Sequence, residues 1–153
     1  MSRIKKILLG FLFVFIAIQF VHPAHNRSSN ELPTDFANVF VVPATVQSTL
    51  QTACYDCHSN NTDYPWYSSI QPIAWMMAWH INNGKAQLNF SSFGSNSKRK
   101  QISKLKEIIN QVRDDEMPLT SYKIMHSKAN LSAQQKILLT AWLTAAADSL
   151  QNK

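Results

Sequence analysis

Cys54-Tyr55-Asp56-Cys57-His58 is the stretch on which the predicted fold is built. The two cysteines are three positions apart, so on a helical turn both thiols point to the same side. The histidine that follows carries an imidazole that can ligate a metal when it is neutral. Such a C-x-x-C-H run is typical of chains whose two cysteines hold one haem covalently and whose histidine ligates the iron. The sequence therefore predicts one covalently attached haem c, bound by Cys54 and Cys57, with His58 as proximal iron ligand.

Three other uses of the two cysteines stay open at this level. A thioredoxin-like redox pair needs a βαβ context, and no strand-like alternation surrounds the motif. A structural zinc site normally takes four Cys or His ligands at paired spacing, whereas the chain has only two cysteines. A disulfide between residues this close would constrain almost no chain.

The N-terminal segment, residues 1–27, looks different from the rest. A basic start is followed by an apolar run over residues 7–21, and the apolar stretch is 18 residues long when it is counted from Ile4. This length is near the lower limit for a membrane-spanning helix, and the end of the run fits a signal-peptide cleavage site poorly. We expect an uncleaved N-terminal transmembrane helix. A cleaved signal peptide and a buried core helix are the alternatives.

Charge gives this expected anchor an orientation. Three basic residues precede the apolar run and only Arg27 follows closely, which places the N-terminus in the cytoplasm. Covalent haem attachment in bacteria takes place on the far side of the inner membrane. The sequence thus predicts a single-pass protein of the bacterial inner membrane with a periplasmic haem domain.

Length and charge set further limits. A chain of 153 residues allows one domain and an appendage. Residues 28–43 are polar and proline-containing and are predicted to be a tether, which leaves residues 44–150 as the haem-binding domain. From Ser28 onward there are 11 Lys and Arg and 9 Asp and Glu, which leaves a net charge of +2. The basic pI therefore gives no reason to expect nucleic-acid binding.

Helical periodicity predicts an all-α, cytochrome c-like bundle of about four short helices around the haem. The expected helices cover residues 44–58, 73–81, 96–113 and a last segment that begins at Ser132 and runs through 145. Gly84 is taken as the stop of the second helix, and Ser132 with Gln135 forms a capping box. Because such a small domain has a thin apolar core, we expect the chain without haem to be poorly folded.

The sixth iron ligand lies outside the C-x-x-C-H motif. Several side chains are candidates: Met76, Met77, His80, Met117, Met125 and His126. Met117 is ranked first, because it follows a helix-breaking segment and precedes Pro118, and a loop ligand can approach the iron opposite His58. His80 is the second choice and His126 stands below it. We also expect the Pro72 carbonyl to accept a hydrogen bond from the His58 ring.

The order of these elements resembles a known family. Small c-type cytochromes commonly have C-x-x-C-H, then a Met-Pro ligand loop, then a Leu-Ser…Trp terminal helix. More specifically, the chain resembles the haem-binding domain family of bacterial membrane-anchored proteins over residues 35–150. The matching segments are Cys54-Tyr-Asp-Cys-His-Ser-Asn, Tyr64-Pro-Trp-Tyr, Gln71-Pro, Trp75, His80-Ile, Gly84, Leu88-Asn-Phe-Ser, Met117-Pro, Met125-His and Leu131-Ser…Trp142. The resemblance implies attachment through Cys54 and Cys57 and His58 as proximal ligand, but it supplies no physiological reaction.

Two functions follow as expectations. The first is single-electron transfer by a membrane-tethered monohaem cytochrome, whose partners are redox proteins and the inner membrane. The second is a haem enzyme of the peroxidase kind, or a sensor of small gases, with an open or displaceable distal site. A haem-bearing accessory subunit without chemistry of its own is a third possibility. The sequence names no catalytic residue and favours a protein that is not an enzyme.

Overall fold

The computed structural model describes residues 2–28, 30 and 32–152, and the fold is helical throughout this part of the chain. No strand occurs among these residues, so the all-α prediction is confirmed. Eight α-helices and three 3₁₀-helices follow one another in the order α1 (Arg3–Ile18), α2 (Phe36–Val39), α3 (Ala44–Ala53), α4 (Tyr55–His58), η1 (Trp66–Ser69), α5 (Ile73–Gln87), η2 (Phe90–Ser95), α6 (Lys98–Arg113), α7 (Thr120–Met125), η3 (Ser127–Ala129) and α8 (Ala133–Gln151).

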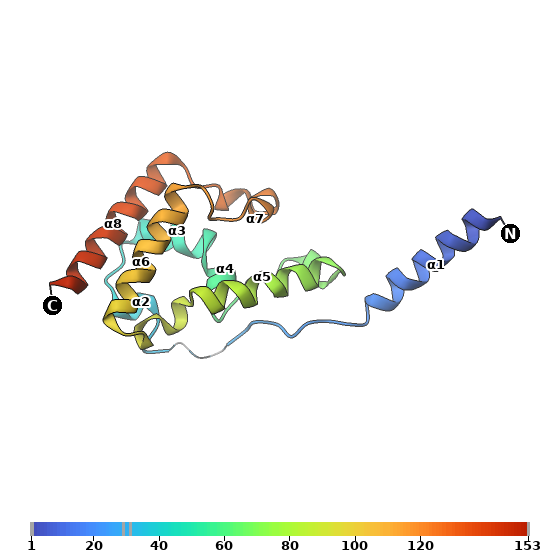
Figure 1. The fold of residues 1–153 in the computed structure, drawn as a ribbon, viewed down its shortest axis with the longest axis horizontal. Coiled ribbons are helices and arrows are strands. Elements are labelled where there is room, and N and C mark those ends of the chain that lie inside the picture. The colour runs from blue at the N-terminus through green and yellow to red at the C-terminus, as the bar shows by residue number, and fades with distance from the viewer. Residues whose placement is uncertain (1, 29, 31, 153) are drawn as a thin grey trace.

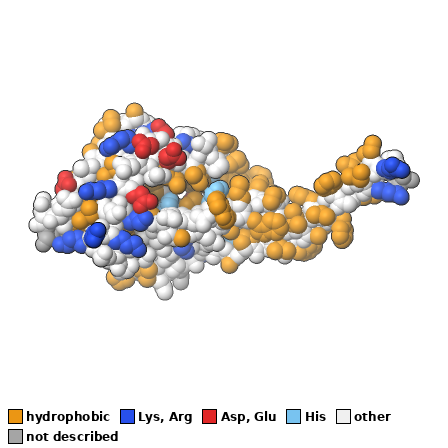
Figure 2. All heavy atoms as spheres, viewed as in Figure 1, with side chains coloured by type: hydrophobic (Ala, Val, Ile, Leu, Met, Phe, Trp, Pro, Cys, Tyr) orange, Lys and Arg blue, Asp and Glu red, His pale blue; other side chains and the backbone are white. Residues whose placement is uncertain are grey.

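The N-terminal helix corrects one prediction. Helix α1 has 16 residues and buries none of them, and it projects away from the other helices at the end of an extended segment (Figure 1). Its surface is hydrophobic, with basic side chains at its start (Figure 2). Within the described residues no helix has both the length and the apolar character that crossing a bilayer requires. The prediction of an N-terminal transmembrane helix is therefore wrong.

The predicted helices form with altered boundaries. The single helix expected over residues 44–58 is divided, because Cys54 leaves helical geometry at φ −128° and ψ −40° and separates α3 from α4. Helix α5 runs past Gly84 to Gln87, so the expected stop at this glycine is wrong. Helix α6 agrees with the expected segment 96–113, and α8 begins with the predicted capping box between Ser132 and Gln135.

The core lies where α6 and α8 pack side by side and α3 packs against α8 (Figure 1). Phe36 of α2 is fully buried in it, although it falls within the segment predicted to be a tether. Its ring meets Phe90 and Phe93 edge-on, with ring centroids 5.2 and 4.9 Å apart. The other large buried side chains of this core are Leu50, Leu105, Val112, Leu139 and Leu143.

Residues 19–28 are fastened to the helical domain by polar contacts. The side-chain oxygen of Gln19 accepts from the Gln71 backbone N–H at 3.0 Å. The side-chain NH₂ of Gln19 donates to the Gln71 backbone carbonyl at 3.3 Å. The Val21 carbonyl accepts from the Gln71 side chain at 2.7 Å. The Asn26 side chain donates to the Ser59 carbonyl at 2.8 Å, and its backbone N–H donates to the Tyr64 hydroxyl at 2.7 Å. This segment thus belongs to the folded domain and fixes where α1 leaves it.

Candidate functional site

The C-x-x-C-H turn faces a cavity. Cys54 caps α3, and its carbonyl accepts from the backbone N–H of His58 at 3.0 Å, which closes the turn that α4 forms. Both cysteines are free thiols. Cys54, Cys57 and His58 all line one cavity of about 550 Å³, and we call it the main cavity. Local backbone geometry thus brings the three residues of the motif together at one wall.

The other walls come from three parts of the chain. Helix α5 contributes residues between Trp79 and Leu88, α6 contributes residues between Lys104 and Val112, and the turn after α6 contributes Met117, Pro118 and Leu119. Phe90 and Tyr122 complete the lining. A volume of this size lies within the roughly 300–1,000 Å³ typical of sites for drug-sized ligands and cofactors.

The His58 ring is oriented by two carbonyl groups. Its Nδ1 lies 3.0 Å from the Gly84 oxygen and 3.1 Å from the Leu88 oxygen. Because a carbonyl oxygen only accepts, Nδ1 must carry the hydrogen, and the lone pair is on Nε2. Burial lowers the pKa of His58 below its ordinary value, which keeps the ring neutral. The acceptors are therefore on α5 and its C-cap, and the expectation that Pro72 supplies this carbonyl is wrong.

Gly84 permits this arrangement. A Cβ at Gly84 would lie 2.7 Å from the backbone oxygen of Cys57 and 3.3 Å from its carbonyl carbon. Any side chain here would push α5 away from α4, because the Cys57 carbonyl is backbone and cannot rotate aside. The glycine is thus a contact residue in the last turn of α5, and its role could not be read from the sequence, where it looked like a helix stop.

The two thiols are held in their protonated form. Burial raises the pKa of Cys54 to about 12, and burial together with the nearby Asp56 carboxylate raises the pKa of Cys57 to about 11. Thiol–disulfide exchange and zinc ligation both need a thiolate, so this environment suits neither. In the described part of the chain, no group of three or more His, Cys, Asp or Glu side chains is arranged to hold a metal ion.

Of the candidates for the sixth ligand, Met117 and His80 share the main cavity with His58. Met117 follows the turn after α6, where its backbone N–H donates to the Gln111 carbonyl at 3.1 Å, and the following Pro118 is buried. His80 lies on α5 and borders both the main cavity and a second one. This second cavity is lined by His126 and by three methionines, namely Met76, Met77 and Met125.

His126 is engaged elsewhere. Its Nδ1 lies 3.2 Å from the Tyr122 backbone oxygen, and its Nε2 lies 3.2 Å from the Tyr67 hydroxyl. The carbonyl fixes the hydrogen on Nδ1, so Nε2 accepts from the Tyr67 hydroxyl. The ring also stacks on Tyr122 with centroids 4.1 Å apart. With both nitrogens occupied, His126 has no lone pair free for a metal in this arrangement.

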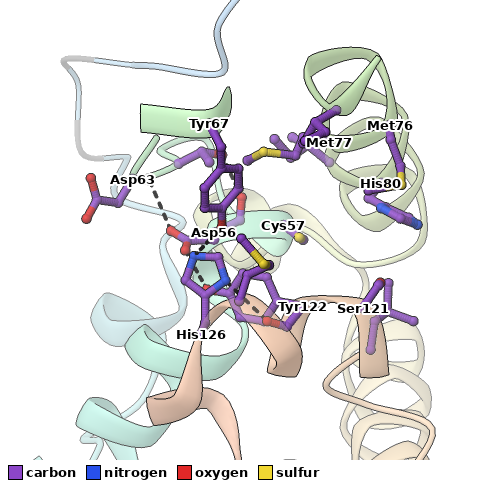
Figure 3. A pocket seen from close by; sticks show the side chains of 15 residues that line it. Asp56, Cys57, Asp63, Tyr67, Met76, Met77, His80, Ser121, Tyr122 and His126 are labelled. Carbon is purple, nitrogen blue, oxygen red and sulfur yellow. Dashed lines mark hydrogen bonds between the residues drawn. The ribbon is translucent and has the colours of Figure 1, made fainter. Parts of the chain in front are cut away.

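Asp56, which lies inside the motif, makes a second set of contacts that the sequence did not predict. Its carboxylate accepts from the Tyr122 hydroxyl at 2.6 Å and from the Asp63 backbone N–H at 3.0 Å (Figure 3). Its backbone carbonyl accepts from the Thr62 hydroxyl at 2.5 Å. Burial, followed by the bond to Asp56, raises the pKa of Tyr122 above its ordinary value, so the hydroxyl remains a donor. The intervening residues of the motif are thus as firmly held as the cysteines and the histidine.

Comparison with known proteins shows a family that binds haem. A family model described as a haem-binding domain matches residues 13–145, which is most of the chain. Neither the curated proteins nor the solved structures contain a match. The residues that line the main cavity fit a haem, since they supply a neutral imidazole with a free Nε2, two protonated thiols beside it, and apolar and aromatic walls.

Proposed function

The chain belongs to the haem-binding domain family, and we propose that it is a monohaem c-type cytochrome that transfers single electrons. Bound haem would supply a reversible one-electron couple at its iron. The work of this chain is then to attach the haem, to ligate the iron on both faces and to keep water away from it.

Attachment would use both cysteines. Cys54 and Cys57 line one wall of the main cavity and would hold the haem through two thioether bonds. Both thiols are available for this role, because neither cysteine is in a disulfide.

The orientation of His58 is the observation that carries the proposal. The Gly84 and Leu88 carbonyls hold the hydrogen on Nδ1 and leave Nε2 free inside a cavity that both thiols also line. A hydrogen bond from Nδ1–H to a carbonyl orients a ligating imidazole and raises its basicity. The same tautomer would serve no purpose in a redox cysteine pair.

For the opposite face we propose Met117 as the sixth ligand, with His80 as the second choice. The Gly84 carbonyl holds the His58 ring, and His80 is one turn away from Gly84 on α5. His80 therefore lies on the same wall of the main cavity as the group that holds the proximal ligand. Met117 comes from the turn after α6, a different wall of the main cavity. Methionine opposite histidine raises the reduction potential and suits electron transfer.

Redox proteins are the partners that this function requires. Trp79 lines the main cavity and is also 63% exposed, so an aromatic side chain reaches from the cofactor site to the surface. In bacteria, haem is attached covalently outside the cytoplasm, and we therefore propose that the domain acts on the periplasmic side of the inner membrane.

One observation supports a second function, that of a haem enzyme or gas sensor with a displaceable distal site. Nδ1 of His58 and both ring nitrogens of His126 are hydrogen-bonded, but within the described residues no hydrogen bond reaches the ring of His80. An imidazole that is free beside a haem can act as an acid or base.

Optical spectra of both oxidation states test the proposal and separate the two functions. We expect a sulfur-to-iron charge-transfer band in the oxidised protein, its loss in Met117→Ala, its retention in His80→Ala, and no carbon monoxide binding by the reduced wild type. Denatured protein should keep its haem, whereas Cys54→Ala/Cys57→Ala should release it. Rapid stoichiometric carbon monoxide binding by the wild type, or a Met117→Ala spectrum identical to that of the wild type, would contradict electron transfer through a Met117-ligated iron.

A further inference from the structure

The second cavity lies beside the main cavity and has features of a ligand site of its own. Its volume is about 210 Å³, and it opens between α5, α7 and the segment around Tyr67 (Figure 3). Cys57, His80, Leu119 and Tyr122 line both cavities, so a single layer of side chains separates them. We call it the side cavity.

Size limits what the side cavity can hold. An engineered apolar cavity of about 150 Å³ in another protein binds benzene. The side cavity is somewhat larger, so it accommodates one six-membered ring with one or two small substituents. A second fused ring or a haem-sized molecule does not fit.

The lining favours an aromatic ring. The side chain of Met77 reaches from α5 across the side cavity toward Tyr67 (Figure 3). Tyr122 and His126 stack as one flat pair with an interplanar angle of 18°. Thioethers and aromatic faces both make favourable contacts with an aromatic ring. No Lys or Arg lines the side cavity, so nothing there compensates a negative charge on the ligand.

Three polar side chains of the lining make no hydrogen bond in the described part of the chain, namely His80, Asp63 and Ser121, and of these only His80 is partly buried. The Tyr67 and Tyr122 hydroxyls bond His126 and Asp56, and both ring nitrogens of His126 are engaged. His80 contacts Trp79 edge-on at 5.0 Å between centroids, but no hydrogen bond to its ring is present in the described part of the chain. A ligand hydroxyl could donate to this imidazole or accept from it.

We propose that the side cavity binds a small, uncharged, monocyclic phenol, whose ring packs between Met77 and the Tyr122–His126 pair and whose hydroxyl hydrogen-bonds to His80. The ligand would share Cys57 and His80 with the lining of the main cavity, but it needs no bond to iron.

Calorimetric titration of the full-length, haem-loaded, reduced protein tests this inference. Phenol should bind once per chain with a Kd on the order of 1 mM or tighter. Toluene keeps the ring but lacks the hydroxyl and should bind about tenfold more weakly. Benzoate carries a charge and should bind at least about tenfold more weakly than phenol. In His80→Phe, phenol should lose its advantage over toluene.

Two variants locate the bound phenol. Met77→Trp should fill the side cavity and abolish binding, whereas Asn82→Trp, a tryptophan on an exposed position of the same helix outside both linings, should bind phenol as the wild type does. Ser121→Trp fills the side cavity from α7 and serves if Met77→Trp misfolds. Equal affinity for phenol and toluene, unchanged binding in a folded filled variant, or a phenol-induced shift of the haem absorption would overturn the proposal. The haem spectrum before phenol is added tests the cytochrome function separately.

Discussion

Gly84 and Cys57 approach so closely that a Cβ on the glycine would lie 2.7 Å from the Cys57 carbonyl oxygen. The same glycine offers its own carbonyl to the His58 ring at 3.0 Å. One residue in the last turn of α5 therefore sets both the distance between α5 and the C-x-x-C-H turn and the tautomer of the imidazole. This contact leads to the first prediction.

Gly84→Ala should lower both stability and haem attachment. The added methyl meets backbone, so α5 and α4 must separate, at a cost of about 1–3 kcal/mol. The separation also weakens the bond to His58 Nδ1. Thermal melting and the ratio of haem to protein absorbance measure the two effects. Gly10→Ala is the matched control, because a Cβ at Gly10 meets nothing within 4 Å. A Gly84→Ala protein that melts and takes up haem as the wild type does would refute the role of this contact.

Tyr122→Phe should destabilise the protein more than Tyr67→Phe does. Both changes remove one hydroxyl, but Tyr122 donates to the Asp56 carboxylate, whereas Tyr67 donates to a neutral imidazole. Hydrogen bonds to charged groups are worth about 1.5–3 kcal/mol, compared with about 0.5–1.5 kcal/mol for neutral pairs. Denaturant titrations of both variants measure the difference. Equal losses in the two variants would show that Asp56 finds another donor, such as water.

The sequence predicted the helical class, the position of α6 and the N-cap of α8, because these depend on local periodicity and capping. It missed the part that depends on distant contacts. Phe36 looked like part of a tether, although it is buried against Phe90 and Phe93. Gly84 looked like a helix stop, since its neighbour across space is 27 positions away in the chain. The N-terminal apolar run indicated a membrane span, but the helix it forms has only 16 residues.

Asp115→Asn should destabilise the protein at neutral pH but not in strong acid. Asp115 adopts a left-handed φ of 60° in the turn before Met117 and forms an ion pair with Lys136 of α8. The hydrogen bond and charge of Lys136 lower the pKa of Asp115 below its ordinary value of 3.8. The ion pair thus stabilises the fold above about pH 4 and is lost as the pH falls through the lowered pKa. Asparagine tolerates the same φ, so the backbone of the turn is kept.

Melting temperatures of wild type and Asp115→Asn, measured from pH 7 down to pH 3, check this prediction. The difference in melting temperature between wild type and Asp115→Asn should be small, because the ion pair is exposed. This difference should become smaller as the pH falls. A gap of constant size across this range would attribute the effect to the turn itself and not to the charge.

Protein made without haem attachment should lose its cooperative melt. A cavity of about 550 Å³ without apolar filling exposes the apolar walls of this small domain to water, and its core is too thin to compensate for that exposure. Expression of Cys54→Ala/Cys57→Ala, followed by calorimetry and circular dichroism, measures the effect. Full helicity with a sharp, native-like transition would show that the helices hold together without the cofactor.

Asn26→Ala should release the segment that joins α1 to the domain. The Asn26 side chain bonds the Ser59 carbonyl, the Thr62 hydroxyl and the Lys85 amine, and its backbone carbonyl accepts from the Thr62 N–H at 3.0 Å. Without the side chain, about 1–3 kcal/mol of local stability is lost. The backbone around Arg27 then opens locally more often. Trypsin should therefore cut after Arg27 about 5–100 times faster under conditions in which local opening limits cleavage. His22→Ala, an exposed change in the same segment, is the control and should leave the rate unchanged. Equal cleavage rates in wild type and Asn26→Ala would mean that the contacts around Gln19 and Gln71 alone hold the segment in place.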